Sequence, residues 1–175
     1  PQITGLVQTR KFVEGSEVKA GALLYQVDPA SYRAAVDSAQ AALAKAQATL
    51  VSTKLQASRY KELVAIKAVS QQEADNAAAT QLQGEADVAS AKAALQTAKI
   101  NLDYTRINAP ISGRIGKSAV TVGALVTANQ TTALATVQKL NPIYVDITQS
   151  SSALLALKRA LAQGTLGSGT AKVTL

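Results

Sequence analysis

An unbroken heptad spacing of apolar and small residues constrains the fold of this chain more than any other feature. Between residues 32 and 64 such residues recur at alternating steps of four and three. A period of about 3.5 residues predicts a narrow coiled-coil seam, whereas a helix of a globular bundle would show a wider apolar face. The seam consists of Tyr32, Val36, Ala39, Leu43, Ala46, Leu50, Thr53, Ala57, Tyr60 and Val64.

A second seam of the same kind follows after a short connection. Asp28-Pro29 is a typical start for the first helix, with Asp28 as N-cap and Pro29 in the first helical position. Ser70 and Glu73 have the spacing of a capping box, which marks the start of the second helix. Because only residues 66–69 separate the two helices, we expect the helices to pack side by side in antiparallel orientation. The first helix should be roughly 55 Å long. The second seam consists of Ala74, Ala77, Gln81, Gly84, Val88, Ala91, Leu95, Ala98 and Leu102.

The segments on either side of this hairpin read as short strands and turns that resemble each other. Residues 1–28 and 104–139 align at a constant offset of 108. Two β halves, each too small to bury a core alone, are expected to pack face to face, with the hairpin inserted between them. We interpret the glycines of the repeat as turn residues without a ligand role: Gly5, Gly15, Gly113 and Gly123. The matched positions also include Val7 with Ile115, Phe12 with Val120, and Val18 with Val126.

The C-terminal residues 141–175 predict a strand, an amphipathic helix and a last strand. The strand patterns are "PIYVDIT" and "AKVTL", and the helical pattern between them is "SSALLALKRALAQ". One strand–helix–strand unit does not make a domain, so its partners must come from elsewhere.

Composition excludes several kinds of chemistry. The chain contains no Cys, His, Met or Trp, so thiol nucleophiles, histidine bases and Cys/His metal sites are absent. No run of about 18 apolar residues is present that could span a membrane. The net charge is +7, which raises the possibility of a nucleic-acid-binding coiled coil. Against it, the acid-free segment 104–145 carries only four cations and no aromatic platform for stacking.

Three stretches together resemble the periplasmic adaptors, or membrane fusion proteins, of AcrA/MexA-type tripartite multidrug efflux pumps. They are "VEGSEVKAGALLYQVDPA", "NLDYTRINAPISGRIGKSAVTVGALV" and "LNPIYVDITQSSSALLALKRAL". The resemblance implies an α+β fold in which a long antiparallel coiled-coil α-hairpin is inserted between two halves of a lipoyl-like β domain. It places that β domain at 1–28 and 104–139, the hairpin at 29–103, and part of a β-barrel domain at 140–175. The chain would then be a fragment that lacks the lipid-bearing cysteine and the rest of the barrel.

The resemblance also implies a function as a non-catalytic scaffold. The expected partners are an inner-membrane transporter of the resistance-nodulation-division (RND) class, an outer-membrane channel protein, and further copies of the chain in a ring. No cofactor, metal site, catalytic residue or nucleic acid is expected. The expected location is the periplasm in association with the inner membrane, with membrane contact only through parts outside this chain.

The connection between the two helices is the predicted partner-binding site. In this family an Arg, a Leu four residues later and a Ser seven residues beyond that contact the channel, which here implies Arg59, Leu63 and Ser70. The sequence adds an independent reason, since an exposed apolar cluster at the end of a rod usually marks a contact. We expect that cluster to comprise Leu63, Val64, Ile66 and Val69. The competing interpretation of Arg59 is a local ion pair with Glu62.

Two alternatives remain beside the RND adaptor. One is an adaptor of an ABC-type exporter or secretion system, which pull-down with a transporter would distinguish. The other is a lipoyl or biotinyl carrier domain. Such a domain carries its modified lysine on a tight turn between the halves, where this chain has residues 29–103 instead.

Overall fold

The computed structural model describes residues 1–142 and 150–163. These residues belong to two units, Pro1–Leu140 and Asn141–Leu175, which we describe separately. The first contains two long helices and two antiparallel sheets, which confirms the predicted α+β class. Its elements are β1 (Gly5–Arg10), β2 (Glu17–Val18), β3 (Leu23–Val27), α1 (Ala30–Ala65), α2 (Gln71–Asp103), β4 (Arg106–Asn108), β5 (Gly113–Ile115), β6 (Leu125–Val126) and β7 (Val137–Gln138).

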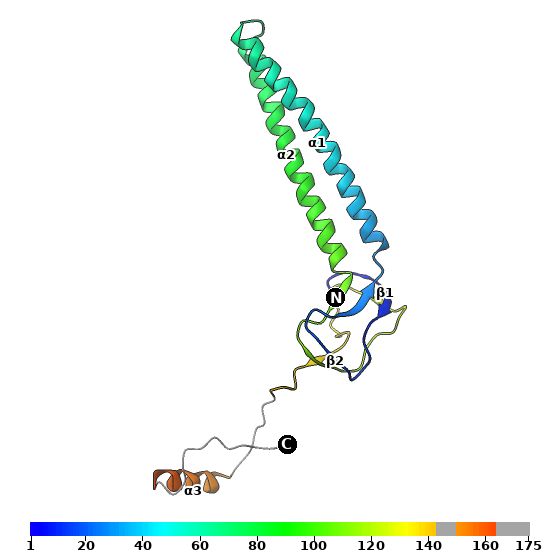
Figure 1. Cartoon of the computed structure of the whole chain (residues 1–175), viewed down its shortest axis with the longest axis vertical. Helices are drawn as coiled ribbons and strands as arrows, with labels where there is room; N and C mark the ends of the chain where they lie inside the picture. The colour runs from blue at the N-terminus through cyan, green and yellow to red at the C-terminus, as the bar shows by residue number, and fades with distance from the viewer. Residues whose placement is uncertain (143–149, 164–175) are drawn as a thin grey trace. The chain divides into compact units, whose positions relative to one another are not determined.

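The helices α1 and α2 lie side by side along their whole length and reverse direction at the end far from the sheets (Figure 1). The 36 residues of α1 span about 54 Å. Along α1, the ten residues that are at least half-buried are the ten predicted seam residues, from Tyr32 to Val64. Along α2 they are the nine predicted ones and Asn101. The heptad interpretation is therefore confirmed residue by residue.

Small seam residues allow the two helices to approach closely. Gly84 of α2 is buried, and a Cβ added to it would lie 3.2 Å from Thr53 Oγ1 and 3.6 Å from the backbone Cα of Leu50. The glycine thus occupies the place where the α1 backbone comes nearest. Away from the seam both helices are exposed, so contact between them provides their main apolar burial.

The start of α1 is one residue later than the sequence predicted. Pro29 occupies the cap position and Ala30 is the first helical residue by hydrogen bonding. Asp28 nevertheless acts as expected, because its Oδ1 accepts a hydrogen bond from the Ala30 N–H at 3.0 Å. Pro29 itself has helical φ and ψ, and its carbonyl accepts from Arg33 N–H at 2.8 Å.

The sheets interlock the two β halves of the chain. One sheet has the order β4-β3-β1-β6 and the other β2-β5-β7, and all strand pairs are antiparallel. In each sheet, a strand that precedes the hairpin pairs with one that follows it. Neither half therefore completes its hydrogen bonding without the other.

Hydrogen bonds repeat with the same offset of 108 as the sequence. The Val7 N–H donates to the Ala124 carbonyl at 2.9 Å. Its counterpart, the Ile115 N–H, donates to the Ser16 carbonyl at 3.0 Å. The register Gly5↔Val126 and Leu6↔Leu125 in one sheet likewise recurs as Gly113↔Val18 and Arg114↔Glu17 in the other. The repeat is therefore an approximate two-fold relation between interlocked halves.

The glycines of this repeat have two different roles, and for one pair the turn interpretation was wrong. Gly15 and Gly123 lie in turns with φ of +77° and +87°, a region in which only glycine is unstrained. Gly5 and Gly113 lie instead in β1 and β5. A Cβ on Gly5 would lie 2.6 Å from Val27 Cγ1, and one on Gly113 would overlap the carbonyl of Gln138. Close packing of neighbouring strands, which the sequence pattern does not reveal, explains this second pair.

The base of the hairpin is fastened to this β unit by polar contacts. The Tyr32 hydroxyl of α1 donates to the Thr4 carbonyl at 2.8 Å. Thr105, which is buried at the end of α2, donates from its hydroxyl to the Leu102 carbonyl at 2.6 Å. The Thr105 carbonyl accepts from Val27 N–H at 2.8 Å. Below these contacts the apolar core contains Val7, Tyr25, Val27, Ile115 and Val126, all nearly inaccessible.

The second unit contributes one described element, the helix α3 (Ser151–Ala162). It corresponds to the amphipathic helix expected after residue 150. The two strands predicted beside it lie outside the described residues, apart from Pro142 at the start of the first. The division into domains at 28/29, 103/104 and 139/140 stays a prediction. None of the described helices has the length and continuous apolar character that crossing a membrane requires.

Replacing Leu95 with Asp should unfold the hairpin more easily. Leu95 is only 6% exposed in the seam, so the substitution removes a buried apolar group and inserts a charge. We expect a loss of about 3 kcal/mol in unfolding free energy, measured by the helical circular dichroism signal in urea. Gln96→Asp, on the exposed face one residue away, is the control and should cost far less. Equal midpoints for the two variants would contradict the coiled-coil packing.

Replacing Gly113 with Ala should destabilise the β unit. The added methyl group has no room beside the Gln138 carbonyl, so β5 and β7 must separate or distort. We expect a loss of about 1–3 kcal/mol, measured by thermal unfolding. Gly116→Ala is the matched control, since its Cβ would lie at an ordinary 3.5 Å from the Thr136 carbonyl. If both variants melt with the wild type, the close approach at Gly113 is wrong.

Candidate functional site at the hairpin tip

The helix α1 ends in a Schellman turn that forms the first half of the tip. The C-cap residue is Ile66. The Ala68 N–H donates to the Leu63 carbonyl at 2.9 Å, and the Lys67 N–H donates to the Val64 carbonyl at 2.9 Å. This pair of bonds satisfies carbonyls that the end of a helix would otherwise leave free. The turn thus stops α1 within two residues and holds Leu63 in the last helical turn.

The turn contains a lysine where glycine is usual. Lys67 has φ of 57°, in the left-handed region that the Schellman turn requires after the C-cap. For a residue with a Cβ this conformation costs roughly 1–2 kcal/mol. This conformation is not predictable from the sequence, because the segment contains neither Gly nor Asn at the bend.

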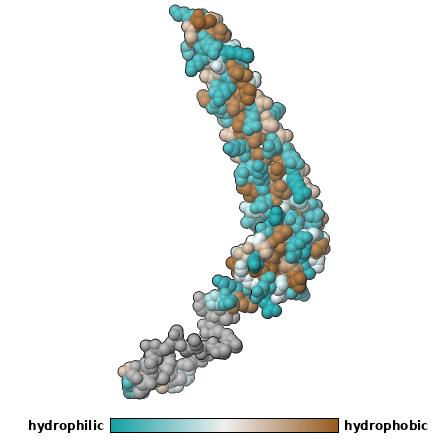
Figure 2. All heavy atoms as spheres, viewed as in Figure 1, coloured by the Kyte–Doolittle hydropathy of each residue, from teal (hydrophilic) through white to brown (hydrophobic). Residues whose placement is uncertain are grey.

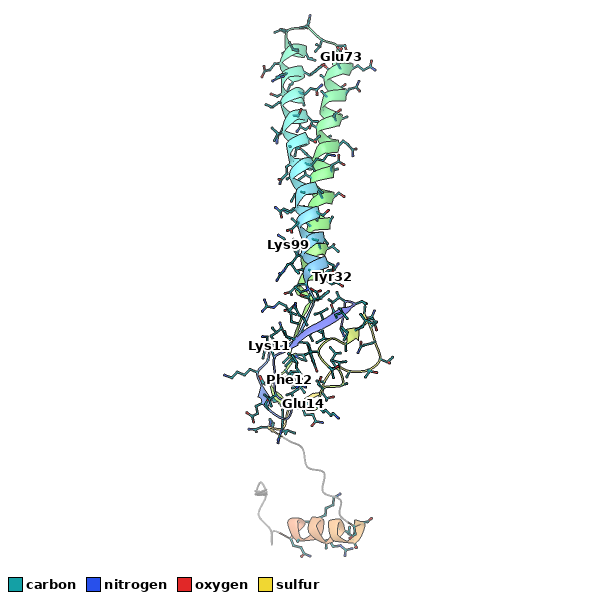
Figure 3. All side chains as sticks on the ribbon, turned by 90° about the vertical axis from the view of Figure 1, so that its right-hand side faces the viewer. Lys11, Phe12, Glu14, Tyr32, Glu73 and Lys99 are labelled. Carbon is teal, nitrogen blue, oxygen red and sulfur yellow. The ribbon has the colours of Figure 1, made fainter. Side chains whose placement is uncertain are left out.

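The helix α2 begins with the predicted capping box, which forms the second half of the tip. The Ser70 hydroxyl accepts from Glu73 N–H at 3.3 Å, and the Glu73 carboxylate accepts from Ser70 N–H at 2.9 Å. The Ser70 hydroxyl also donates to that carboxylate at 2.9 Å. The hydrogen bond from the Ser70 backbone has the larger effect and the one from its hydroxyl the smaller. Both hold the pKa of the Glu73 carboxyl below its ordinary value. The Glu73 side chain appears beside the turn in Figure 3.

The three predicted contact residues are all solvent-exposed at this end of the hairpin. Arg59 and Leu63 lie in the last two turns of α1, and Ser70 is the N-cap of α2. Within the described residues, Arg59 forms no salt bridge with Glu62. The local ion pair considered from sequence is therefore not formed. Nothing in the geometry assigns the three residues a partner, so their role remains a prediction.

The apolar cluster expected at the tip is smaller than the sequence suggested. Leu63 is 36% exposed and Ile66 is 73% exposed, as expected for a contact surface. Val64 instead packs into the end of the seam, and Val69 is half-buried. The sequence placed Val64 both in the seam and in the exposed cluster, and the seam assignment is the one confirmed. The interpretation of Val69 as exposed was wrong, since it is half-buried. Figure 2 shows apolar atoms among polar ones at this far end of the hairpin.

A groove along the side of the hairpin extends from the tip toward its middle. It has a volume of about 700 Å³ and lies between the two helices. Val51 and Leu55 line it although they are 61% and 55% exposed. The remaining apolar and small residues of its lining are Ala57, Val64, Ala74 and Ala78, with Lys54 and Lys61 also present. Small side chains beside exposed branched ones suit the packing of a further helix, a feature that the seam analysis missed.

Another charged cluster lies in the β unit and has a structural explanation. The Glu14 carboxylate accepts from Ser118 N–H at 3.1 Å and from Arg10 at 2.7 Å. The hydrogen bond from the Ser118 backbone has the largest effect on the Glu14 carboxyl, and Arg10 adds to it. Together they hold the pKa of that carboxyl below its ordinary value. The cluster joins the two halves of the repeat. Among the described residues, no three Asp or Glu side chains come together as a metal site.

Residues 1–138 match the family described as "RND MFP, barrel-sandwich hybrid domain", where MFP denotes membrane fusion protein. The chain is 55% identical to the multidrug efflux pump subunit AcrA of Escherichia coli K12, over 100% of this chain and 45% of that protein. It is also 55% identical to the multidrug resistance protein MexA of Pseudomonas aeruginosa PAO1, over 100% of this chain and 43% of that protein.

A solved structure agrees in fold. The crystal structure of MacA from Actinobacillus actinomycetemcomitans matches with a TM-score of 0.63 and 30% identity, over 80% of this chain and 48% of that one. The chain thus spans less than half the length of each of these three relatives.

Replacing Glu73 with Ala should make the hairpin less stable at neutral pH. The wild-type carboxylate has a depressed pKa in the folded state, so its contribution is present above the unfolded pKa. The contribution is lost as the pH falls through the folded pKa. We therefore expect the melting temperatures of wild type and E73A to differ at neutral pH and to converge in acid, measured by circular dichroism. A difference that persists unchanged in acid would contradict the capping box as its source.

Proposed function

The chain belongs to the AcrA/MexA type of the RND membrane fusion protein family, and on that premise we propose that it is the periplasmic adaptor of a tripartite efflux pump. It would bridge an inner-membrane RND transporter and an outer-membrane channel. The observation that carries this proposal is the tip: Leu63 and Ile66 are exposed at the end of a helix pair about 54 Å long. Apolar side chains left exposed so far from the core suit contact with another protein.

The mechanism we propose is assembly rather than catalysis. The seam keeps α1 and α2 in register, so the rod can hold the tip at a defined distance from the β unit. Arg59, Leu63 and Ser70 would contact the periplasmic end of the channel. The groove beside Val51 and Leu55 would accept helices of the channel by coiled-coil packing, which its small and branched side chains support.

The β unit would contribute contacts between copies and with the transporter. Leu6 of β1 and Leu125 of β6 are paired across the two strands, and both are exposed. An apolar pair on a strand surface supports side-by-side stacking of protomers into a ring. Each such contact is small, so we expect the free chain to be a monomer or weak oligomer that gains affinity by multivalency once a ring forms.

The proposed location is the periplasm, in association with the inner membrane. Membrane contact would come through parts of the protein outside this chain. An adaptor of an ABC-type exporter receives less support, because the matching family model is the RND one. Pull-down of the complete gene product from membranes, followed by identification of the transporter, distinguishes the two.

Leu63→Ser and Arg59→Asp should each abolish drug efflux while leaving thermal stability nearly unchanged. Both side chains are exposed, so their loss affects the contact and not the fold. The measurement is dye efflux in cells that depend on the variant adaptor. The matched controls are Leu82→Ser, an exposed leucine within α2, and Arg33→Asp, an exposed arginine at the base of α1. If efflux survives both tip substitutions, the tip is not the channel-binding site.

A further inference from the structure

Lys67 occupies the left-handed position after the C-cap of α1, where glycine or asparagine is usual. The described part of the chain has only two residues other than glycine with positive φ, Lys67 and Asn129. Asparagine tolerates this conformation, whereas lysine gains nothing from it. A glycine at position 67 would form the same turn with less strain. The presence of lysine therefore calls for a reason other than folding.

The Lys67 side chain has no role within the described structure. It is exposed, and no hydrogen bond or ion pair engages it in the described residues. The hydrogen bonds of Lys67 in the turn come from its backbone, which any residue except proline could supply. Lys67 is thus an exposed cation at the end of the hairpin, and it follows the exposed Ile66 directly in sequence.

The charge within the turn favours an acidic partner. Arg59, Lys61 and Lys67 are exposed cations of the tip segment. Three acidic residues lie in the same segment, Glu62 in α1 and Glu73 and Asp75 in α2, so residues 59–75 are balanced in charge. Within the turn itself, residues 63–70, the one charged side chain is that of Lys67. The apex of the tip therefore presents exposed apolar side chains, Leu63 and Ile66, together with a single positive charge.

We propose that Lys67 is a further partner-contact residue, whose ammonium pairs with an Asp or Glu carboxylate on the protein surface that receives Leu63 and Ile66. This inference rests on the proposed function of the tip as the contact with the outer-membrane channel. A charged group at the rim of an apolar contact mainly speeds correct encounter and excludes wrong partners. The Schellman turn sets the position of Lys67, and its long side chain can then reach beyond the apolar contact.

The test compares three substitutions at position 67 in the complete gene product. Lys67→Gly removes the charge and the strain, Lys67→Arg keeps the charge, and Lys67→Glu reverses it. Each variant also carries Ala68→Cys, a crosslinking site that is unique within this chain because the chain contains no cysteine. Crosslinking to the outer-membrane channel in intact cells and the rate of dye efflux report the contact. Thermal unfolding reports the fold.

For K67G we expect thermal stability equal to or above that of the wild type, together with a crosslinking yield lowered about threefold. K67R should retain the yield, and K67E should lose more of it than K67G. If K67G retains full crosslinking and efflux, the inference is wrong. It is also wrong if K67R loses as much as K67G, since charge would then not be the property that matters.

Leu63→Ser, combined with the same Ala68→Cys crosslinking site, distinguishes a failure of this inference from a failure of the proposed function on which it rests. If L63S loses the crosslink while K67G keeps it, only the role of Lys67 fails. If both variants keep the crosslink and full efflux, neither Leu63 nor Lys67 is needed for the contact, and the roles proposed for both residues fail. If the Ala68→Cys chain without further substitutions gives no crosslink to the channel, the proposed function of the tip fails as well.

Discussion

The close contact between α1 and α2 determines whether the rest of this molecule can act. Neither helix buries an apolar face beyond a narrow seam, so each is stable chiefly against the other. Gly84 allows the backbones to approach near Leu50, and larger seam residues such as Leu95 are buried between the helices. This alternation of small and large side chains keeps the hairpin paired over more than thirty residues of each helix.

The β unit solves a different problem, that of holding two chain ends beside each other. Each half of the repeat is too small for a core, and each pairs its strands with those of the other half. The ends of the hairpin therefore arrive where β3 and β4 are already neighbours. Tyr32 and Thr105 then bond the first and last turns of the hairpin region to this unit. An insertion of this length is compatible with the fold because its two ends start adjacent.

Sequence reasoning succeeded where one period or one motif determines the structure. The heptad spacing predicted the seam because burial in a coiled coil follows position along the helix, and Ser70 with Glu73 predicted the second helix start because a capping box is local. It failed where spatial neighbours decide. Gly5 and Gly113 look like turn residues until strands pack against them, and Val69 looks exposed although it is half-buried in the turn. The left-handed conformation of Lys67 was not predictable from a segment that lacks the usual glycine. The roles of Arg59, Leu63 and Ser70 rest on resemblance, since geometry alone assigns them no partner.

The connection of both hairpin legs to neighbouring strands has a mechanical consequence. The chain leaves β3 to enter α1 and returns from α2 into β4, and these two strands are antiparallel partners. A pull on the tip therefore draws both strands in the same direction, so it does not slide one past the other. The load passes to the pairing of β3 with β1, where several backbone hydrogen bonds share it. A long lever attached in this way can transmit force to its base without unzipping the strands to which it is joined.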